Sequence, residues 1–223
     1  MKRLAVVGLA AVAGLATSAA PASAAAAQRT VVLKTAKGAL AVGAPLTLSN
    51  THLPFNGPWG EFICTSSATG ALGQNGSATD TAELTSATFG DLGEEPCYIV
   101  EGKFSTAIVR ALDLPWRFEL ATDNLGAVKG TPAVAFEVEL ISSNGDGAVT
   151  SRKCVYEKRG LKTITGFGKP MEIELTRTSV RFLLNKARSG EGCLKQMFWG
   201  SEPDEAGNWE VSSNGEPVEA DLS

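Results

Sequence analysis

The chain has 223 residues, a formal net charge of −4 at pH 7, and contents of 43% hydrophobic and 20% charged residues. This composition is typical of a folded globular protein and excludes a wholly disordered chain, and the glycines follow no collagen-like period. A single histidine excludes most histidine-dependent catalysis. Composition therefore limits the chemistry but does not assign a function.

The first 24 residues have the three parts of a secretory signal peptide. A basic start, Met1-Lys2-Arg3, precedes the uncharged apolar run Leu4–Ala16, and the segment ends in Ala22-Ser23-Ala24. The apolar run is shorter than the ~20 residues that a membrane-spanning helix needs. We therefore expect a signal peptide over residues 1–24, cleavage after Ala24, no membrane anchor, and secretion of the mature chain.

Alternation of apolar and polar residues predicts β-strands along the mature chain. Strands are predicted at residues 30–34, 45–48, 61–65, 97–100, 106–111, 116–120, 136–140, 153–157, 171–175, 179–184 and 209–212. Asn-Gly pairs favour tight turns between them, and residues 142–147 carry the strongest hairpin signal. The predicted class is all-β and antiparallel, either a β-sandwich or a distorted barrel.

The segment 123–132 is rich in Gly, Asn and Pro and is the best internal boundary. It would separate a first β unit, 25–123, from a second, 132–223, with two cysteines in each. A weak similarity between the strands before Cys64 and Cys193 favours two related units. One continuous domain over residues 30–223 is the alternative.

Four cysteines, Cys64, Cys97, Cys154 and Cys193, indicate two disulfide bonds in an exported chain. Three connectivities are open, and the shortest loops favour Cys64–Cys97 and Cys154–Cys193. No two cysteines lie within four residues, so the spacing does not fit a zinc site. Residues 144–147 resemble only a fragment of a calcium loop, and a hairpin tip is the better interpretation. We expect no metal and no cofactor.

Charge is unevenly distributed along the second half of the chain. Residues 150–195 hold 11 Lys and Arg against 4 Asp and Glu, whereas residues 196–223 hold 7 Asp and Glu and no Lys or Arg. The densest basic group consists of Arg152, Lys153, Lys158, Arg159 and Lys162. One hypothesis is a site for an anionic envelope phosphopolymer. The favoured alternative is that the acidic end, Glu202 to Asp221, folds back and neutralises the basic segment.

No catalytic residue is assigned. His52 has no Gly-x-Ser-x-Gly context and is expected in a surface loop. Asp113 and Glu119 are weak candidates for the carboxylate pair of a glycosidase, and solvated strand charge is the better interpretation. Trp59 and Trp199 are candidates for sugar stacking, although tryptophan more often seals the edge of a core.

Several short features carry a resemblance: the Ala-rich signal, Leu114-Pro115-Trp116, Cys154-Val155-Tyr156, and the Gly/Pro-led strands before Cys64 and Cys193. In these features the chain resembles uncharacterised exported proteins of high-GC Gram-positive bacteria. The resemblance implies export, disulfides and β structure, and no activity.

These observations favour a secreted, non-catalytic β protein with a binding or structural role at or outside the cell envelope. One alternative is a carboxylate-based extracellular hydrolase of polysaccharide. Another is a secreted inhibitor or toxin-like partner of another protein. The expected partner is an envelope polymer or a secreted protein, and not nucleic acid.

Overall fold

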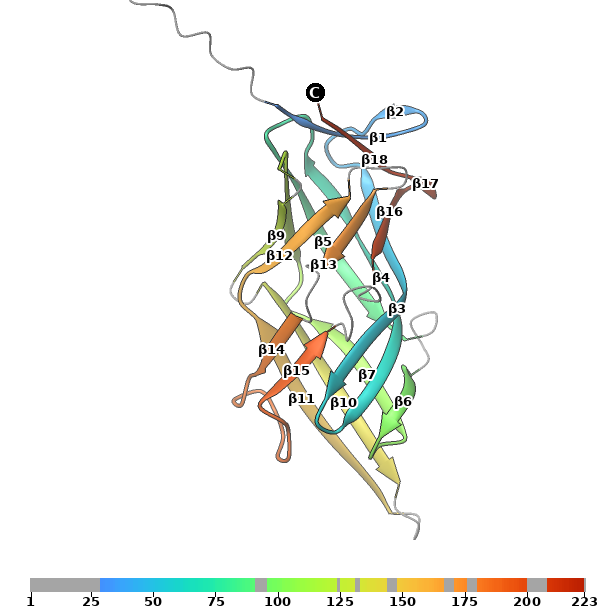
Figure 1. The fold of residues 1–223 in the computed structure, drawn as a ribbon, viewed down its shortest axis with the longest axis vertical. Helices are drawn as coiled ribbons and strands as arrows, with labels where there is room; N and C mark the ends of the chain where they lie inside the picture. Colours follow the sequence, from blue (N-terminus) through green and yellow to red (C-terminus); the bar gives the residue numbers. More distant parts are fainter. Residues whose placement is uncertain are drawn as a thin grey trace, which may run out of the picture.

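The computed structural model describes residues 29–90, 96–123, 125–130, 133–143, 148–166, 171–175, 180–199 and 208–222. These residues form strands and no helix, so the predicted all-β, antiparallel class is confirmed (Figure 1). The strands are β1 (Val31–Thr35), β2 (Gly38–Ala39), β3 (Pro45–Gly57), β4 (Gly60–Gln74), β5 (Thr79–Phe89), β6 (Tyr98–Gly102), β7 (Thr106–Leu112), β8 (Trp116–Ala121), β9 (Leu125–Lys129), β10 (Val134–Ser143), β11 (Val149–Lys158), β12 (Leu161–Gly166), β13 (Glu172–Leu175), β14 (Val180–Leu184), β15 (Gln196–Trp199), β16 (Trp209–Ser213), β17 (Glu216–Pro217) and β18 (Glu219–Leu222).

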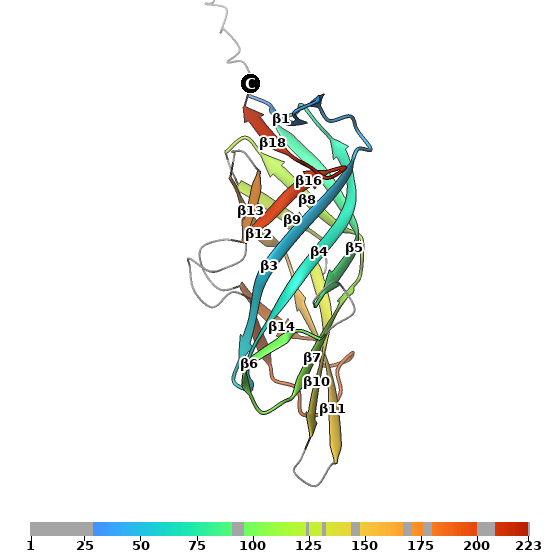
Figure 2. The ribbon, with the colours of Figure 1, turned by 90° about the vertical axis from the view of Figure 1, so that its right-hand side faces the viewer.

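Three long antiparallel strands, β3, β4 and β5, run along the long axis of the molecule, and the sheet closes on them twice (Figure 2). In the upper half of Figure 1, pairing runs from β5 through β8, β9, β12, β13 and β16 back to β3. In the lower half it runs from β5 through β7, β10, β11, β14 and β15 back to β3. We call these closed arrangements the upper ring and the lower ring.

The two rings correspond to the distorted barrel rather than to the sandwich. Each ring contains strands from both sides of residues 123–132, because β10 to β16 complete the rings that β3, β4 and β5 begin. That segment therefore does not mark a break in the sheet.

Side chains fill the interiors of both rings. In the lower ring Phe136 packs on Phe182 with ring centroids 4.7 Å apart, and Phe55 stacks on Trp199 at 5.8 Å. A gap in the upper ring has a volume of about 20 Å³ and lies among apolar side chains that include Trp116. A gap of that size holds no more than about one water molecule. This gap is therefore packed core and not a chamber for a ligand.

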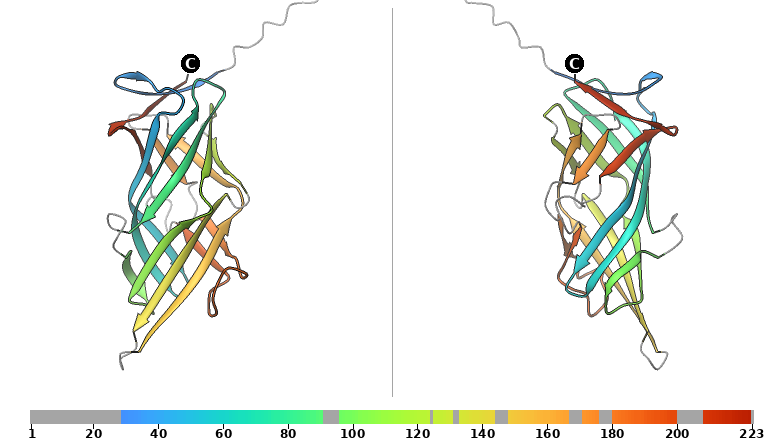
Figure 3. Two further views of the ribbon diagram at one scale, coloured as in Figure 1. Left: turned by 180° about the vertical axis from the view of Figure 1, so that it is seen from behind. Right: turned by 45° about the vertical axis from the view of Figure 1, so that its right-hand side comes forward.

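The chain ends meet at the top of the molecule, where β18, β1 and β2 form a separate three-stranded antiparallel sheet (Figure 3). Val31, Leu33 and Ala220 bury their side chains beneath it. Backbone pairing and burial thus hold both ends of the described chain to the upper ring.

Two disulfide bonds are present, Cys64–Cys97 and Cys154–Cys193, which is the nearest-neighbour pairing expected from the sequence. The first joins β4 to the residue before β6, and the second joins β11 to the segment before β15. Such bonds fit an oxidising extracellular environment. Within the described ranges no helix has the length and hydropathy to cross a bilayer.

Candidate functional site

The structure divides the five predicted basic residues among separate places. Lys162 is exposed on β12 in the upper ring, opposite Ala127. Arg152 and Lys153 are consecutive in β11, so their side chains lie on opposite faces of the sheet. Lys158 and Arg159 stand at the end of β11, where the chain passes from the lower ring to the upper ring.

Lys153 belongs to an ion-pair ladder on the outer face of the lower ring. Its Nζ lies 3.7 Å from a carboxylate oxygen of Glu139. Arg110 donates hydrogen bonds to Glu137 at 3.1 Å and to Glu139 at 2.9 Å. The hydrogen bond from Arg110 lowers the pKa of Glu139, so this carboxylate stays charged and neutralises its neighbours. The ladder is therefore a structural feature and leaves Lys153 with a partner.

Lys158 and Arg159 instead line a groove with a volume of about 590 Å³ on the outside of the molecule. The walls are the end of β11, the strand β14 and the turn that follows β14. The lining residues are Glu157, Lys158, Arg159, Arg181, Leu183, Leu184, Asn185 and Lys186. We call this the basic groove, because four of these side chains are cationic and one is a carboxylate.

Strand pairing concentrates the positive charge. In the antiparallel register of β11 and β14, Glu157 lies opposite Leu183, and Arg159 and Arg181 both line the groove beside this pair. Like charges gathered along one groove repel one another. None of the groove's four cations has a carboxylate partner among the residues that the structure describes. An anion bound between them would relieve this repulsion.

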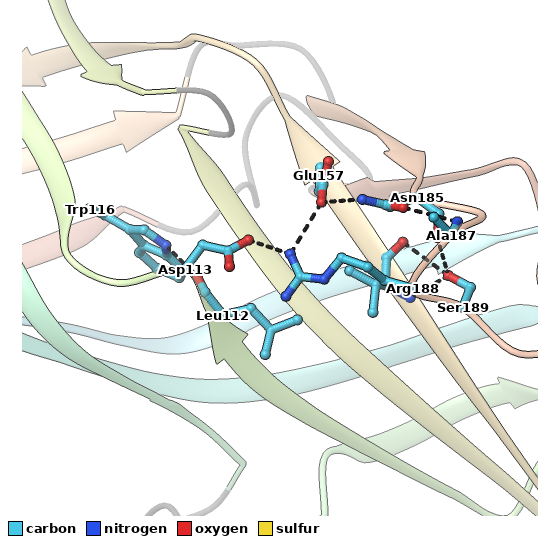
Figure 4. A network of polar contacts seen from close by, with 9 residues as sticks. Leu112, Asp113, Trp116, Glu157, Asn185, Ala187, Arg188 and Ser189 are labelled. Atoms are coloured by element: carbon cyan, nitrogen blue, oxygen red, sulfur yellow. Dashed lines mark hydrogen bonds and ion pairs between the residues drawn. The ribbon is translucent and has the colours of Figure 1, made fainter.

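The one carboxylate of the groove is already neutralised. Glu157 accepts a hydrogen bond from Asn185 Nδ2 at 2.6 Å and lies 3.4 Å from Arg188 Nη1 (Figure 4). The same guanidinium bonds Asp113, whose backbone has a φ of 54°, at 2.5 Å. Arg188 thus bridges two carboxylates from different strand ends, and the groove keeps its net positive charge.

A set of local hydrogen bonds fixes the turn that carries Lys186. Asn185 Oδ1 accepts the Ala187 N–H at 3.1 Å, and the Ser189 hydroxyl donates to the Asn185 carbonyl at 2.7 Å. The Val155 N–H donates to Ser189 Oγ at 2.8 Å and ties the turn to β11. The sequence Asn-x-x-x-Ser is the local signal for this turn, because Asn and Ser side chains bond nearby backbone. Sequence reasoning did not identify it, nor Arg181 and Lys186.

The favoured expectation, that the acidic end neutralises the basic segment, is wrong for Glu216, Glu219 and Asp221. Lys37 donates to Glu216 at 2.6 Å, and this hydrogen bond lowers the pKa of Glu216. Lys34 pairs with Asp221 and lies 3.9 Å from Glu219. These carboxylates face β1 at the top of the upper ring, because β18 pairs with β1. Glu202, Asp204 and Glu205 lie outside the described residues.

Each of the weaker catalytic candidates, His52, Glu119 and Asp113, makes a local contact in the structure. His52 is exposed within β3, at an irregularity in its pairing with β4, and not in a loop as expected. Its N–H donates to Asn50 Oδ1 at 2.6 Å. Glu119 pairs with Lys129 at 3.0 Å, and Asp113 with Arg188. Glu119 and Asp113 are thus engaged in separate ion pairs, and neither contact joins the two carboxylates to each other.

The two tryptophans differ in exposure. Trp199 is buried in the lower-ring core with 4% of its surface exposed. Trp59 is partly buried at the β3–β4 turn and stacks on Phe62 at 6.0 Å. Trp199 therefore offers no ring face to a sugar, and Phe62 covers one face of Trp59.

Within the described ranges no cluster of three or more His, Cys, Asp or Glu side chains could hold a metal ion. Comparisons of the chain with protein-family models, with curated proteins and with solved structures find no match in any of the three. Geometry and charge are therefore the evidence on function.

Proposed function

We propose that this protein is a secreted, non-catalytic bacterial binding protein that holds a phosphate-bearing polymer of the cell envelope in the basic groove. The observation that carries the proposal is the groove's four cations against one carboxylate that Asn185 and Arg188 already satisfy. Secretion rests on the signal-like residues 1–24 and agrees with the two disulfides.

Three features of the groove suit a chain-like anion. It lies open on the outer surface, so a polymer can enter it without threading. Arg159 and Arg181 offer planar guanidinium groups that can bind phosphate with two hydrogen bonds each. The exposed Leu183, 53% accessible, lies between the cations and offers contact to the polymer's carbon backbone.

The test is binding of poly(glycerol phosphate) to the mature protein over a range of salt concentrations. Each neutralised phosphate contributes about 0.7 to the slope of log affinity against log salt for a single-stranded polyanion, so four cations predict a slope near −3. The double variant Arg159→Gln, Arg181→Gln should lose about half of that slope. Lys162→Gln is the matched control, because Lys162 is an exposed cation outside the groove, and it should keep the full slope.

A second control addresses the acidic end. Neutralising Glu216, Glu219 and Asp221 together should change the affinity for the polymer by less than about twofold. These carboxylates pair with Lys34 and Lys37 and not with the groove. Salt at 0.15 M also screens charges over a distance of ~8 Å. If the wild-type protein does not bind the polymer at low salt, the proposal fails. If Lys162→Gln loses as much of the salt slope as the groove variant does, binding is unspecific and the groove is not the site.

A further inference from the structure

A pocket with a volume of about 140 Å³ opens at the lower end of the lower ring, away from the basic groove. It lies between the β3–β4 turn, the segment between β6 and β7, and the strands of the β10–β11 hairpin (Figure 1). Trp59, Phe104 and the Cys154–Cys193 bridge contribute apolar surface, and Lys103 and Arg152 contribute positive charge. Among the residues that the structure describes, none of those lining the pocket is a carboxylate.

Arg152 lies on the inner face of the ring. It pairs with Leu140 in the β10–β11 ladder, and the next inward positions along β11 are the buried Cys154 and Tyr156. Arg152 itself is exposed to solvent, so its guanidinium is accessible to a ligand. Its only hydrogen bond within the described residues is a long one, 3.5 Å, from Nη1 to the Gly192 carbonyl.

Because Gly192 has no side chain, the guanidinium of Arg152 can lie across the Gly192 backbone. The residue has a φ of 77°, and a Cβ there would stand 3.3 Å from the Arg152 Cζ. The guanidinium is thereby held over the pocket beside the disulfide, with donors still free for an acceptor, since a guanidinium has five N–H groups.

Another part of the pocket lining is aromatic. Trp59 and Phe104 meet edge to face with centroids 5.8 Å apart. A flat apolar group could pack against this wall while its charged end reaches Arg152 and Lys103. An apolar cavity of 150 Å³ is known to accept benzene. A pocket of about 140 Å³ therefore has room for a ligand with about one six-membered ring.

We infer that this pocket is a second binding site, which takes a small organic anion with a flat ring, such as an arylcarboxylate or an aryl phosphate. Recognition divides between the aromatic wall and the inward Arg152, so both the ring and the charge are required. The site is independent of the basic groove, because none of its lining residues belongs to the groove.

The test uses benzoate and phenyl phosphate as probes, with benzyl alcohol as the neutral and benzamidine as the cationic analogue. The readout is tryptophan fluorescence, because Trp59 alone among the four tryptophans is not fully buried. Saturable quenching by at least one anion is expected, with benzyl alcohol binding about tenfold more weakly and benzamidine not at all. Comparing the two anions decides between carboxylate and phosphate.

The matched variants are Arg152→Gln and Lys153→Gln, which remove the same charge from adjacent residues on opposite faces of β11. Arg152→Gln should weaken anion binding about tenfold or more, and Lys153→Gln by less than about twofold. The ligand series on the wild-type protein keeps the test valid if a variant fails to fold. Absence of binding by both anions at concentrations up to about 10 mM, which corresponds to a binding free energy weaker than about −2.7 kcal/mol, would overturn the inference. Equal binding of benzoate and benzyl alcohol would also overturn it.

Discussion

Removing the Cys154–Cys193 bridge tests how the chain between β14 and β15 is held in place. This segment carries Lys186 of the basic groove at one end and Gly192 of the lower pocket at the other. Apart from the bridge, backbone hydrogen bonds fasten it to β11, for example from the Gly190 N–H to the Lys153 carbonyl at 2.9 Å. The double variant Cys154→Ala, Cys193→Ser suits the site, because Cys154 is buried and Cys193 is partly exposed.

The expected loss of stability follows from the size of the closed loop. Residues 154 and 193 are 39 apart in sequence, and the chain-entropy relation gives about 4 kcal/mol for a loop of that length. The other bridge, with a separation of 33, should contribute nearly the same, since the logarithmic dependence leaves a difference of about 0.2 kcal/mol. Cys64→Ala, Cys97→Ala is therefore a matched control, with a further loss because both of its side chains are buried.

The assay is urea unfolding of the oxidised proteins, together with limited trypsin digestion. Trypsin should cut faster at Lys186, Arg188 and Lys195 in the Cys154 variant than in the control, because local opening of this segment needs no unfolding of the rings. A loss below about 1 kcal/mol, with the control near 4, would refute the reasoning. It would show that hydrogen bonds alone hold the segment.

Two further predictions concern buried ionisable groups. Burial raises the pKa of Tyr156 to about 12, so the folded state holds this proton more tightly than the unfolded state, in which the pKa is about 10. Stability should be intact below pH ~10 and fall by about 2–3 kcal/mol as the pH approaches 12, and urea midpoints of Tyr156→Phe should lack that fall. Burial also raises the pKa of Asp80, which is fully inaccessible and accepts hydrogen bonds from Ser77. The folded state therefore loses stability as the pH rises above the unfolded pKa of ~3.9. The free energy of unfolding of Asp80→Asn, relative to that of the wild type, should therefore increase between pH ~3 and ~7. A constant difference between the two proteins over that range would contradict this.

The sequence by itself determined the local structure wherever alternation was strong. Residues 136–140 and 116–120 alternate cleanly and lie in β10 and β8. The strand β5, Thr79–Phe89, was not predicted, because small and polar residues such as Thr and Ser weaken the contrast between its faces. The cysteine pairing followed from loop length, since both bridges join nearest neighbours along the chain.

Only the tertiary structure decided which charges meet. The basic segment and the acidic end adjoin in sequence, but β18 pairs with β1, so its carboxylates face Lys34 at the far end of the molecule. Arg159 and Arg181, 22 positions apart in sequence, line one groove because β11 pairs with β14. Strand registers depend on the burial of whole faces and on closure of the rings, which are properties of distant segments packed together and not of any one stretch of sequence. Alternation could place Arg152 and Lys153 on opposite faces, but only the closed lower ring shows that the face of Arg152 is the inside.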